Sequence, residues 1–322
     1  MIRKGLKYLK QEGLVNFCRR VIIFLVIETW ASIMVRIKFL GKPKDIVMGI
    51  QGSLMRLNID DKGVARELAL EGIRERLCTE TIQKQLRNGD CVLDIGANIG
   101  YYCLMESRLV GKTGKVYAIE PVPYNMNRLR ENIELNGYSN VETFQIAIGE
   151  RDGKASLYLS DHPNWCSFYP PRVVKGEVEV DVLSLDSFTE NKRMPDMIRM
   201  DVEGFEYEIL EGMPGILGSG APLKYFVEFH PDMMGRERAI QFLEILKRHG
   251  FVLKRVVIEP HTYPPFSRWA LAFVDYLNQK KLKMKFGAYE MSIDELLANK
   301  PLMDGWAGHP GLFLERKANT KD

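Results

Sequence analysis

The stretch Val92-Leu-Asp-Ile-Gly-Ala-Asn-Ile-Gly100 decides the fold of this chain. An apolar run typical of a buried strand ends at Asp94. A turn with Gly96, Asn98 and Gly100 follows, and a helical pattern begins near Tyr101. Glycines between a strand and a helix let the backbone pass close to a ligand and point the helix N-terminus at it. The stretch therefore predicts the first strand, turn and helix of a doubly wound α/β sheet, with a ligand at the turn.

A second apolar run, Lys115-Val-Tyr-Ala-Ile119, leads directly into Glu120, about twenty residues beyond Gly100. An acid at this distance, at the end of the second parallel strand, is placed to accept hydrogen bonds from a ribose diol. The two strand ends together predict a cofactor that contains a nucleoside.

The residue at the start of the turn indicates which cofactor this is. A dinucleotide site reads Gly-x-Gly-x-x-Gly because a pyrophosphate sits on the helix N-terminus. Here Asp94 stands where the first glycine would be. A carboxylate repels a pyrophosphate but suits a ligand that carries an ammonium and a sulfonium group. The turn therefore favours S-adenosylmethionine over NAD, and a nicotinamide dehydrogenase is kept as the alternative.

Charge is unevenly distributed along the 322 residues, whose formal net charge is +3. Residues 1–44 contain ten basic and two acidic residues, so the remaining chain is mildly acidic and is not expected to bind nucleic acid. The five cysteines are odd in number and include no Cys-x-x-Cys pair. This argues against a disulfide framework or a zinc site and favours a reducing, cytoplasmic location, with Cys91 and Cys103 as buried core thiols.

The N-terminal segment offers two interpretations. Residues 21–35 are apolar but include Glu28 and Ser32, and they are fewer than the roughly 20 residues of a membrane-spanning helix. No convincing signal-peptide cleavage site is present. The polar residues of 1–44 fall on helical faces, which predicts amphipathic helices. These helices either pack on the catalytic domain or on a second subunit of a homodimer, or they form a peripheral anchor on an anionic inner-membrane surface.

Beyond residue 62, strand and helix patterns alternate, which is typical of βαβ units and a mostly parallel sheet. We therefore expect an extension, residues 1–62, with a small hairpin at 46–60 that turns near Gly49 and Gly52, and one domain, residues 63–322. Strands are expected near residues 91–95, 115–119, 141–146, 196–201, 223–229, 251–258 and 311–315, and helices near 63–87, 100–110, 123–136, 203–212 and 234–249.

Two insertions, residues 150–190 and 259–310, interrupt the alternation. The first contains two strand patterns around an aromatic, proline-rich loop with Trp165, Phe168 and Tyr169. Loops of this length in a compact domain are usually lids or binding surfaces. Flat aromatic side chains suit sugar rings as well as lipids or plain packing. We expect this loop to be a lid that faces the second substrate.

Polar residues stand where the expected strands end. In an open α/β sheet, ligands bind outside the carboxyl ends of the strands, so these residues should meet at one edge. Four separate strand ends deliver acids there, and one also delivers a histidine. The residues placed at this edge are Asp94, Glu120, Ile146, Ala147, Asp201, Glu203, Glu228 and His230.

An ordered set of motifs over about residues 70–258 resembles one known family, the FkbM-type S-adenosylmethionine-dependent methyltransferases. The motifs are DIGANIGYY (94–102), IEPVPYNMNRLRENIELNG (119–137), AIGERDG (147–153), LSLDSF (183–188), RMDVEGFEYEILEG (199–212) and VEFHP (227–231). The resemblance implies a Rossmann-like class I methyltransferase with a seven-stranded sheet that methylates hydroxyl groups of sugars or polyketides. We expect an O-methyltransferase acting on a glycan, a lipid-linked saccharide or a similar small molecule. A cofactor-binding scaffold without catalysis is the alternative from another class.

The cofactor side of the site is expected to start at the turn. Asp94 and Gly96 would border the methionine part of S-adenosylmethionine, with Asp94 reaching the ammonium or capping the next helix. Asn98 and Gly100 complete the turn, and Asn98 either contacts the ligand or serves the turn alone. Glu120 would bind the ribose diol. Ile146 and Ala147 would line the adenine.

The reacting side is expected at the later strand ends. Asp201 and Glu203 would lie near the transferred methyl, or Glu203 would favour the N-terminus of the next helix. His230 has the pKa range of a general base and Glu228 would orient it, unless His230 caps the helix after Pro231. No metal is expected, and a divalent ion on Asp201, Glu203 and His230 is the alternative. Arg199 stands where the family often has lysine, and arginine keeps its proton, so a lysine-type base is excluded there.

Overall fold

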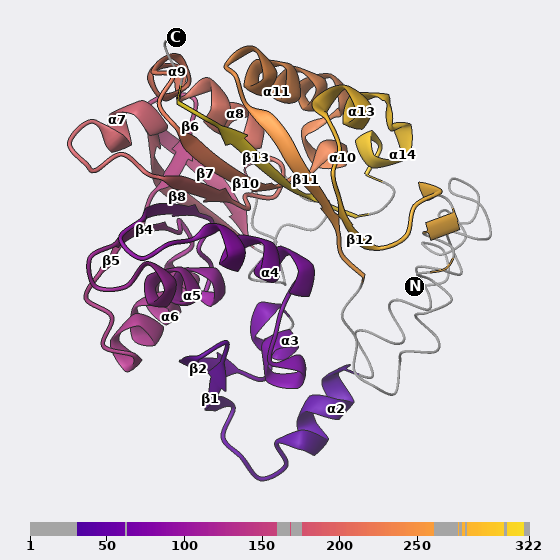
Figure 1. Ribbon diagram of the computed structural model, residues 1–322. Coiled ribbons are helices and arrows are strands. Elements are labelled where there is room, and N and C mark those ends of the chain that lie inside the picture. Colours follow the sequence, from indigo (N-terminus) through magenta and orange to yellow (C-terminus); the bar gives the residue numbers. More distant parts are fainter. Residues whose placement is uncertain are drawn as a thin grey trace.

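An eight-stranded sheet with helices on both faces forms the centre of the computed structural model (Figure 1). Its strand order is β12-β11-β13-β10-β9-β3-β4-β5. The strands are β3 (Cys91–Ile95), β4 (Lys115–Ile119), β5 (Val141–Phe144), β9 (Met197–Met200), β10 (Leu223–Glu228), β11 (Val252–Ile258), β12 (Gly287–Tyr289) and β13 (Gly311–Arg316). The structure describes residues 31–61, 63–159, 168, 176–260, 276, 279–280, 282–305 and 308–318.

The sheet is doubly wound and mostly parallel, as expected. The run β10-β9-β3-β4-β5 is parallel throughout, and β13 lies antiparallel between β10 and β11. All seven expected strands form within two residues of their expected ends. The eighth strand, β12, comes from the second insertion and adds an antiparallel edge to β11. A strand of three residues shows no periodicity, which is why the sequence did not predict it.

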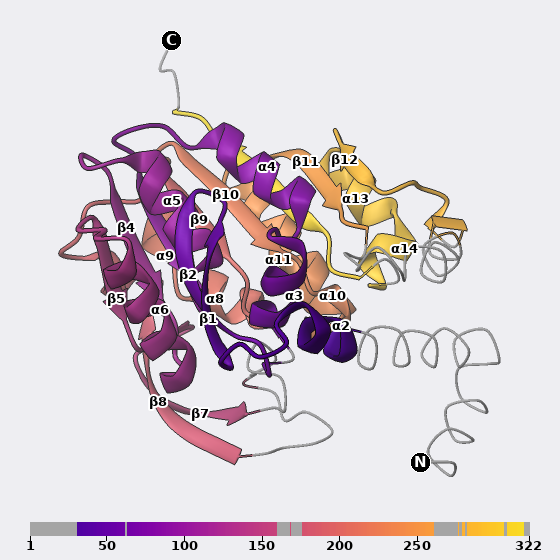
Figure 2. The ribbon, with the colours of Figure 1, turned by 90° about the horizontal axis from the view of Figure 1, so that it is seen from below.

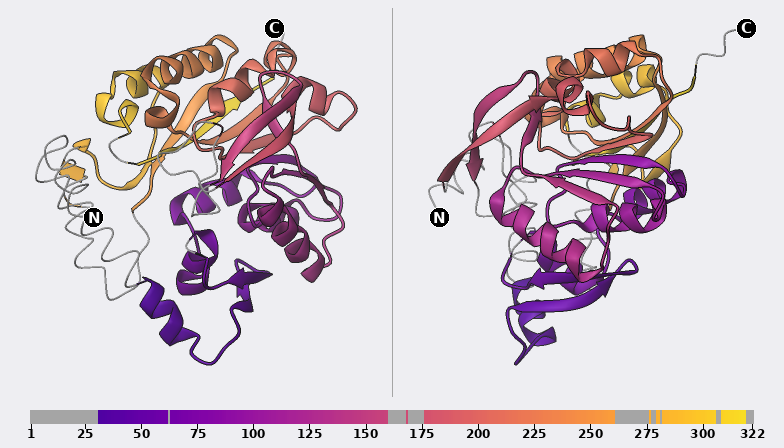
Figure 3. Two further views of the ribbon diagram at one scale, coloured as in Figure 1. Left: turned by 180° about the vertical axis from the view of Figure 1, so that it is seen from behind. Right: turned by 90° about the vertical axis from the view of Figure 1, so that its left-hand side faces the viewer.

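The helices of the earlier part of the chain cover one face of the sheet, and those of the later part cover the other (Figure 3). Every residue of β3 is buried, which explains why its sequence is a continuous apolar run rather than an alternating one. One face carries α3 (Val64–Glu71), α4 (Arg76–Gln85), α5 (Tyr101–Val110) and α6 (Pro123–Leu135). The other carries α7 (Leu185–Thr189), α8 (Glu206–Glu211), α9 (Pro214–Gly218), α10 (Pro231–Met234), α11 (Arg236–Arg248), α13 (Ile293–Ala298) and α14 (Lys300–Met303).

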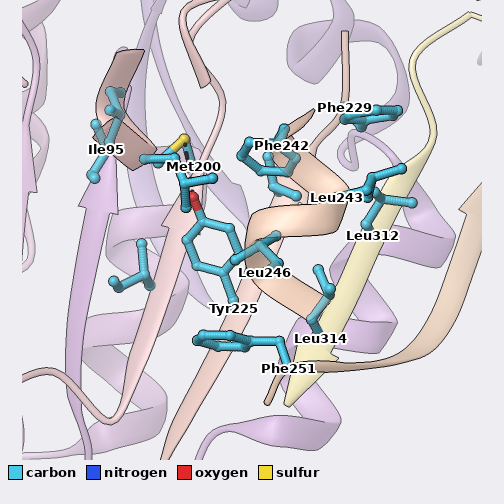
Figure 4. Packing of buried hydrophobic residues seen from close by; sticks show 14 of the residues in the cluster. Ile95, Met200, Tyr225, Phe229, Phe242, Leu243, Leu246, Phe251, Leu312 and Leu314 are labelled. Atoms are coloured by element: carbon cyan, nitrogen blue, oxygen red, sulfur yellow. Dashed lines mark hydrogen bonds between the residues drawn. The ribbon is translucent and has the colours of Figure 1, made fainter. Parts of the chain in front are cut away.

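The core between the sheet and α11 is built from large side chains (Figure 4). Tyr225 is fully buried in β10, and its hydroxyl lies 3.4 Å from the sulfur of Met200. Phe242 and Leu246 of α11 are also fully buried and pack against this strand. The packing fixes β9 and β10 relative to each other, and the site residues begin one residue beyond β9 and at the end of β10.

The expected helix at 63–87 is two helices, α3 and α4. Gly72 ends α3 with a left-handed φ of 71°, and its N–H donates to Leu68 O. Glu75 also has a positive φ, 43°, immediately before α4. The helical periodicity continues on both sides of this break, so periodicity alone predicted one element.

The expected hairpin forms as β1 (Asp45–Ile50) and β2 (Ser53–Asn58), and Gly52 lies in its turn with a φ of 86°. Gly49 lies inside β1 instead of near the turn. The N–H of Leu54 donates to Asn136 Oδ1 and that of Arg56 to Asn132 Oδ1, both over 2.7 Å. The hairpin is thereby attached to α6 and its C-terminal end.

The first insertion forms the two expected strands, β7 (Gly153–Leu159) and β8 (Gly176–Ser184), which pair antiparallel. A short strand, β6 (Ala147–Gly149), pairs parallel with β8 and completes a second sheet of three strands. The β7–β8 hairpin extends away from the main body (Figure 2). Trp165 and Tyr169 lie outside the described residues, so the expected lid stays a prediction.

The N-terminal extension is described from α2 (Ala31–Lys38) onward, and α2 packs against α3. The earlier part of the expected amphipathic segment lies outside the described residues. No helix in the described part of the chain has the length and apolar character that crossing a bilayer requires. Cys78, Cys91 and Cys103 are free and buried, as expected for the latter two.

Candidate active site

The turn after β3 is shaped by contacts between protein segments. Gly96 has a φ of 83°, and a Cβ there would lie 1.9 Å from the carbonyl oxygen of Asp201. Gly100 has a φ of 99°, and a Cβ there would lie 2.7 Å from Leu129 Cδ1. The two glycines are therefore required by the close approach of neighbouring protein atoms. The expected close approach of this turn to a ligand stays a prediction.

Asn98 takes the expected left-handed conformation, with a φ of 51°. Its side chain accepts a hydrogen bond from the N–H of Ile99 over 2.8 Å. The backbone N–H of Asn98 donates to Glu120 Oε2 over 2.9 Å. Asn98 thus stabilises the turn, which was one of its two expected roles. Its contact with a ligand stays a prediction.

A pocket opens at this turn, at the carboxyl ends of β3, β4 and β9. Its empty volume, including the part open to solvent, is about 900 Å³. Predicted site residues that line it are Gly96, Asn98, Glu120, Ala147, Asp201 and Glu203, and the further lining residues include Arg74, Tyr101, Tyr102, Val122, Ile148, Phe168, Arg199 and Phe205.

Glu120 is 4% exposed and reaches into this pocket from the end of β4. The N–H groups of Val122 and Asn98 each donate to one of its carboxylate oxygens over 2.9 Å. Burial raises the pKa of Glu120 to about 7, although these two hydrogen bonds favour the ionised form. The carboxylate is therefore fixed in orientation, with acceptor capacity left for a ligand.

Asp94 is fully buried beneath the pocket, and its Oδ1 lies 3.1 Å from Nη1 of Arg199. Burial raises the pKa of Asp94, and Arg199 opposes that shift. The same guanidinium donates to Gly96 O and, over 3.0 Å, to Asp201 Oδ2. It also stacks on the ring of Tyr102 at 4.2 Å. Arg199 therefore fastens β3 to β9 through two carboxylates, and Asp94 acts on the pocket from behind this arginine.

The adenine side is shifted by one residue from its expected place. Ala147 lines the pocket as expected, and its partner is Ile148 of β6. Ile146 instead packs against the hydrophobic core. The chain leaves β5 after Phe144 and enters β6 at Ala147. Ile148 belongs to the same core as Ile146 but also lines the pocket.

A second group of polar residues adjoins the pocket beyond Asp201 and Glu203. His230, at the end of β10, is 1% exposed, and its Nδ1 lies 2.6 Å from Glu206 Oε1. Its Nε2 lies 3.8 Å from Glu203 Oε2 and 4.0 Å from Glu228 Oε1. Glu206, not the expected Glu228, therefore orients the imidazole. His230 occupies the N-cap position of α10, but its side chain makes no capping hydrogen bond to that helix.

The pKa values of this group are strongly shifted. Burial alone would lower the pKa of His230, but the carboxylates of Glu206, Glu203 and Glu228 outweigh it and raise that pKa well above its ordinary value. Burial raises the pKa of Glu203 to about 7 and, with Asp201 and Glu75 adding to it, raises that of Glu228 well above its ordinary value. Burial favours a higher pKa at Asp201, but Arg199, His230 and Arg74 together outweigh it and lower that pKa. Shifts of this kind are typical of functional sites.

Several residues of the site were not predicted. Glu206 lies in the helical motif after Asp201, where an acid near a helix start has an ordinary capping explanation. His309 stands in the second insertion, and its ring centroid is 4.1 Å from that of His230. Phe168 and Phe205 pack with centroids 4.5 Å apart at the pocket wall. For Glu206, only its spacing of three residues from Glu203 could have indicated that it lies at the site. His309 is distant in sequence from the other site residues and gives no such signal.

The pocket meets the requirements of S-adenosylmethionine. A buried acid, Glu120, is held in place to accept hydrogen bonds from a diol, and the walls at Val122, Ala147 and Ile148 are apolar, as an adenine needs. The carboxylates of Asp201 and Glu203 also line the pocket, where they can face the ammonium and sulfonium groups of the cofactor.

Comparison with known proteins agrees with this reading of the site. A model described as "Methyltransferase FkbM domain" matches residues 94–253. The fold is that of the Rossmann-like, S-adenosylmethionine-dependent methyltransferases. Residues 94–253 of the chain belong to the FkbM methyltransferase family.

Two curated relatives match a similar region. One is "Methyltransferase 1" of Beauveria bassiana, 28% identical over 144 residues, which cover 38% of this chain and 57% of that protein. Another is "Hexuronic acid methyltransferase AglP" of Haloferax volcanii, 27% identical over 139 residues, 42% of this chain and 55% of that protein. The chain thus spans little more than half the length of these relatives.

Shorter matches and solved structures are also similar. "Protein-L-isoaspartate O-methyltransferase" of Ignicoccus hospitalis is 44% identical over 57 residues, 18% of this chain and 27% of that protein. The solved M. jannaschii TYW2 in complex with AdoMet has a TM-score of 0.41 at 15% identity, with 86% of this chain and 88% of that chain covered.

Proposed function

We propose that this protein transfers the methyl group of S-adenosylmethionine to a hydroxyl oxygen of a glycan, a lipid-linked saccharide or a similar small molecule. One observation carries the proposal: the cofactor pocket is continuous with a cluster of carboxylates around His230, because Asp201 and Glu203 line the pocket and also face that histidine. A hydroxyl is a weak nucleophile and gains from hydrogen-bond acceptors that hold it and draw off its proton.

The reaction places geometric demands on these residues. The cofactor supplies an electrophilic methyl group, which a hydroxyl oxygen must approach in line with the bond that breaks. Much of the rate enhancement can come from holding that alignment. Asp201 is fixed by Arg199 over 3.0 Å, so its carboxylate is a rigid acceptor for the hydroxyl hydrogen. Glu203 is held in a left-handed backbone conformation, φ 51°, which directs its side chain to the pocket.

A saccharide acceptor is supported by two facts. The similar protein of Haloferax volcanii is named a hexuronic acid methyltransferase. Phe168, from the first insertion, packs on Phe205 at the pocket wall. Aromatic faces suit the apolar faces of sugar rings.

The test is transfer of labelled methyl from S-adenosylmethionine to a panel of monosaccharides, uronic acids and polyprenyl-linked saccharides, with the product analysed for an O-methyl group. Glu203→Gln is expected to lower kcat by about 100-fold, which is the lower end of the rate contribution of a residue that activates the nucleophile. Glu237→Gln, an exposed residue of α11, is the matched control and should leave the rate unchanged. Labelling of nitrogen or carbon instead of oxygen would contradict the proposal.

A further inference from the structure

We propose that Asp201, Glu203 and His230 form a binding site for one divalent metal ion, of the Mn²⁺ or Mg²⁺ kind, at the reacting end of the pocket. One ligand atom from each of these residues lies within 4.8 Å of the others. The ion's role in catalysis rests on the proposed function, because that function places the acceptor hydroxyl at Asp201 and Glu203. The existence of the site rests on the geometry alone.

The two nitrogens of His230 are in different situations. Nδ1 is fixed by Glu206 at 2.6 Å, and Glu206 is itself fully buried. Nε2 points at Glu203 and Glu228 but lies 3.8 and 4.0 Å from their oxygens, beyond hydrogen-bond length. Among the described residues, no hydrogen bond to Nε2 is formed. A carboxylate on one nitrogen, with the other nitrogen directed at further carboxylates, is the arrangement around a metal-ligating histidine.

The distances also fit an ion. With bonds of about 2.1 Å, neighbouring ligands of an octahedral ion lie about 3 Å apart and opposite ones about 4.2 Å apart. The 3.8 Å between His230 Nε2 and Glu203 Oε2 falls between these values. A direct hydrogen bond would need a shorter distance, so the gap is of the size that an ion between the two groups requires.

Charge supports the same conclusion. Asp201, Glu203, Glu206 and Glu228 gather around one buried imidazole. Arg199 pairs with Asp201 and also with Asp94. One carboxylate oxygen of Glu206 is buried without a hydrogen-bond partner in the described structure. A dication held by Asp201 and Glu203 would balance these carboxylates in place of the protonated imidazole.

A second set of potential ligands shares His230: Glu228, His230 and His309. Nε2 of His309 already lies 3.2 Å from Asp232 Oδ1, which leaves only Nδ1 of this ring for an ion. Asp201 and Glu203 line the pocket, whereas Glu228 and His309 do not. An ion on the first set would therefore have its open positions toward the substrate, and the first set is the one we propose.

The donor set also indicates the kind of ion. Two carboxylates place it with Mg²⁺ and Mn²⁺, and an imidazole favours the transition metal of the two. The ion would hold the acceptor oxygen and lower the pKa of its hydroxyl. As the oxygen–methyl bond forms and the methyl–sulfur bond breaks, the hydroxyl proton leaves to water. Asp201 and Glu203 would then act on the hydroxyl through the ion.

The experiment uses the full-length protein, stripped with a chelator and titrated with Mn²⁺ by calorimetry and by electron paramagnetic resonance. One bound Mn²⁺ per chain is expected. Glu203→Gln should weaken binding at least tenfold, and Glu206→Gln should weaken it by about 10- to 100-fold, as losing the partner of a ligating histidine does. His309→Ala should still bind. S-adenosylhomocysteine binding by each variant shows that it is folded.

Two results would overturn the site. The first is a wild-type protein that binds S-adenosylhomocysteine but no Mn²⁺ or Mg²⁺. The second is loss of the ion in His309→Ala with retention in Glu203→Gln, which would assign it to the other set. Methyl transfer measured in the same stripped samples separates the two proposals. Full methyl transfer without metal would remove the ion's catalytic role and leave the proposed function standing. Metal binding without methyl transfer to any hydroxyl would leave the metal site standing and contradict the proposed function.

Discussion

Glu120 shows how one residue combines a local structural role with ligand binding. Two backbone N–H groups fix its carboxylate, and burial raises its pKa to about 7, with the charge of Asp94 adding slightly. Its position was predictable from the sequence because a strand end and a fixed spacing define it. The hydrogen-bond partner of His230 was not predictable from the sequence, because Glu228 and Glu206 are both acids near strand or helix ends and only packing distinguishes them.

The raised pKa of Glu120 predicts a pH dependence of cofactor binding. The ionised carboxylate accepts both hydrogen bonds of the ribose diol, and protonation removes part of that capacity. The pKa of Glu120 in the free protein is about 7. S-adenosylhomocysteine binding should therefore weaken by about tenfold as the pH falls from about 8 to about 6 and Glu120 becomes protonated.

Calorimetry across this pH range checks the effect. Glu120→Gln, which cannot ionise, should bind more weakly at pH about 8 and lose most of the pH dependence. An unchanged pH dependence in Glu120→Gln would assign the titration to another group of the pocket.

At the scale of elements, strands and helices followed from periodicity, whereas breaks and short strands did not. The division of residues 63–87 into α3 and α4 depends on the left-handed Gly72 and Glu75, and Glu75 is a residue type that rarely takes this conformation. The short strand β6, which carries Ala147 and Ile148 to the pocket wall, forms by pairing with β8. These features are set by tertiary contacts that a local pattern does not contain.

The attachment of the hairpin to α6 predicts a stability effect. Asn132 is fully buried, accepts from Arg56 N over 2.7 Å and donates to Ile99 O over 2.9 Å. Asn132→Ala leaves both backbone groups unpaired, at a cost of about 1–3 kcal/mol for each that stays buried. The free energy of unfolding, measured with urea, should fall accordingly. Glu134→Ala, at an exposed position of the same helix, should change it little, and equal stability of the two variants would contradict the assigned role of Asn132.

For the molecule as a whole, the N-terminal extension is the part whose role is still a prediction. In α2 and the residue pair after it, Ile33, Ile37 and Leu40 are 42%, 62% and 85% exposed. Exposed apolar side chains beside Arg36 and Lys42 suit an anionic lipid surface, where each basic residue contributes on the order of 1 kcal/mol. They suit a dimer interface equally well.

Flotation with anionic liposomes distinguishes the two roles. For a membrane anchor, the full chain should bind and be released by high salt, and a chain beginning at Lys44 should stay unbound. For a dimer interface, neither should bind, and the truncation should convert a dimer into a monomer in sedimentation. That second outcome would end the anchor hypothesis.

The roles proposed for the pocket residues all depend on S-adenosylmethionine occupying the pocket between the β3 turn and Glu120. Calorimetric titration of the full chain with S-adenosylhomocysteine and with NADH tests this most directly. We expect one S-adenosylhomocysteine and no NADH to bind per chain. We also expect at least a tenfold loss of affinity in Glu120→Ala, about 1.4 kcal/mol or more, with Glu134→Ala unchanged. Binding of NADH in place of S-adenosylhomocysteine, or full affinity in Glu120→Ala, would contradict it.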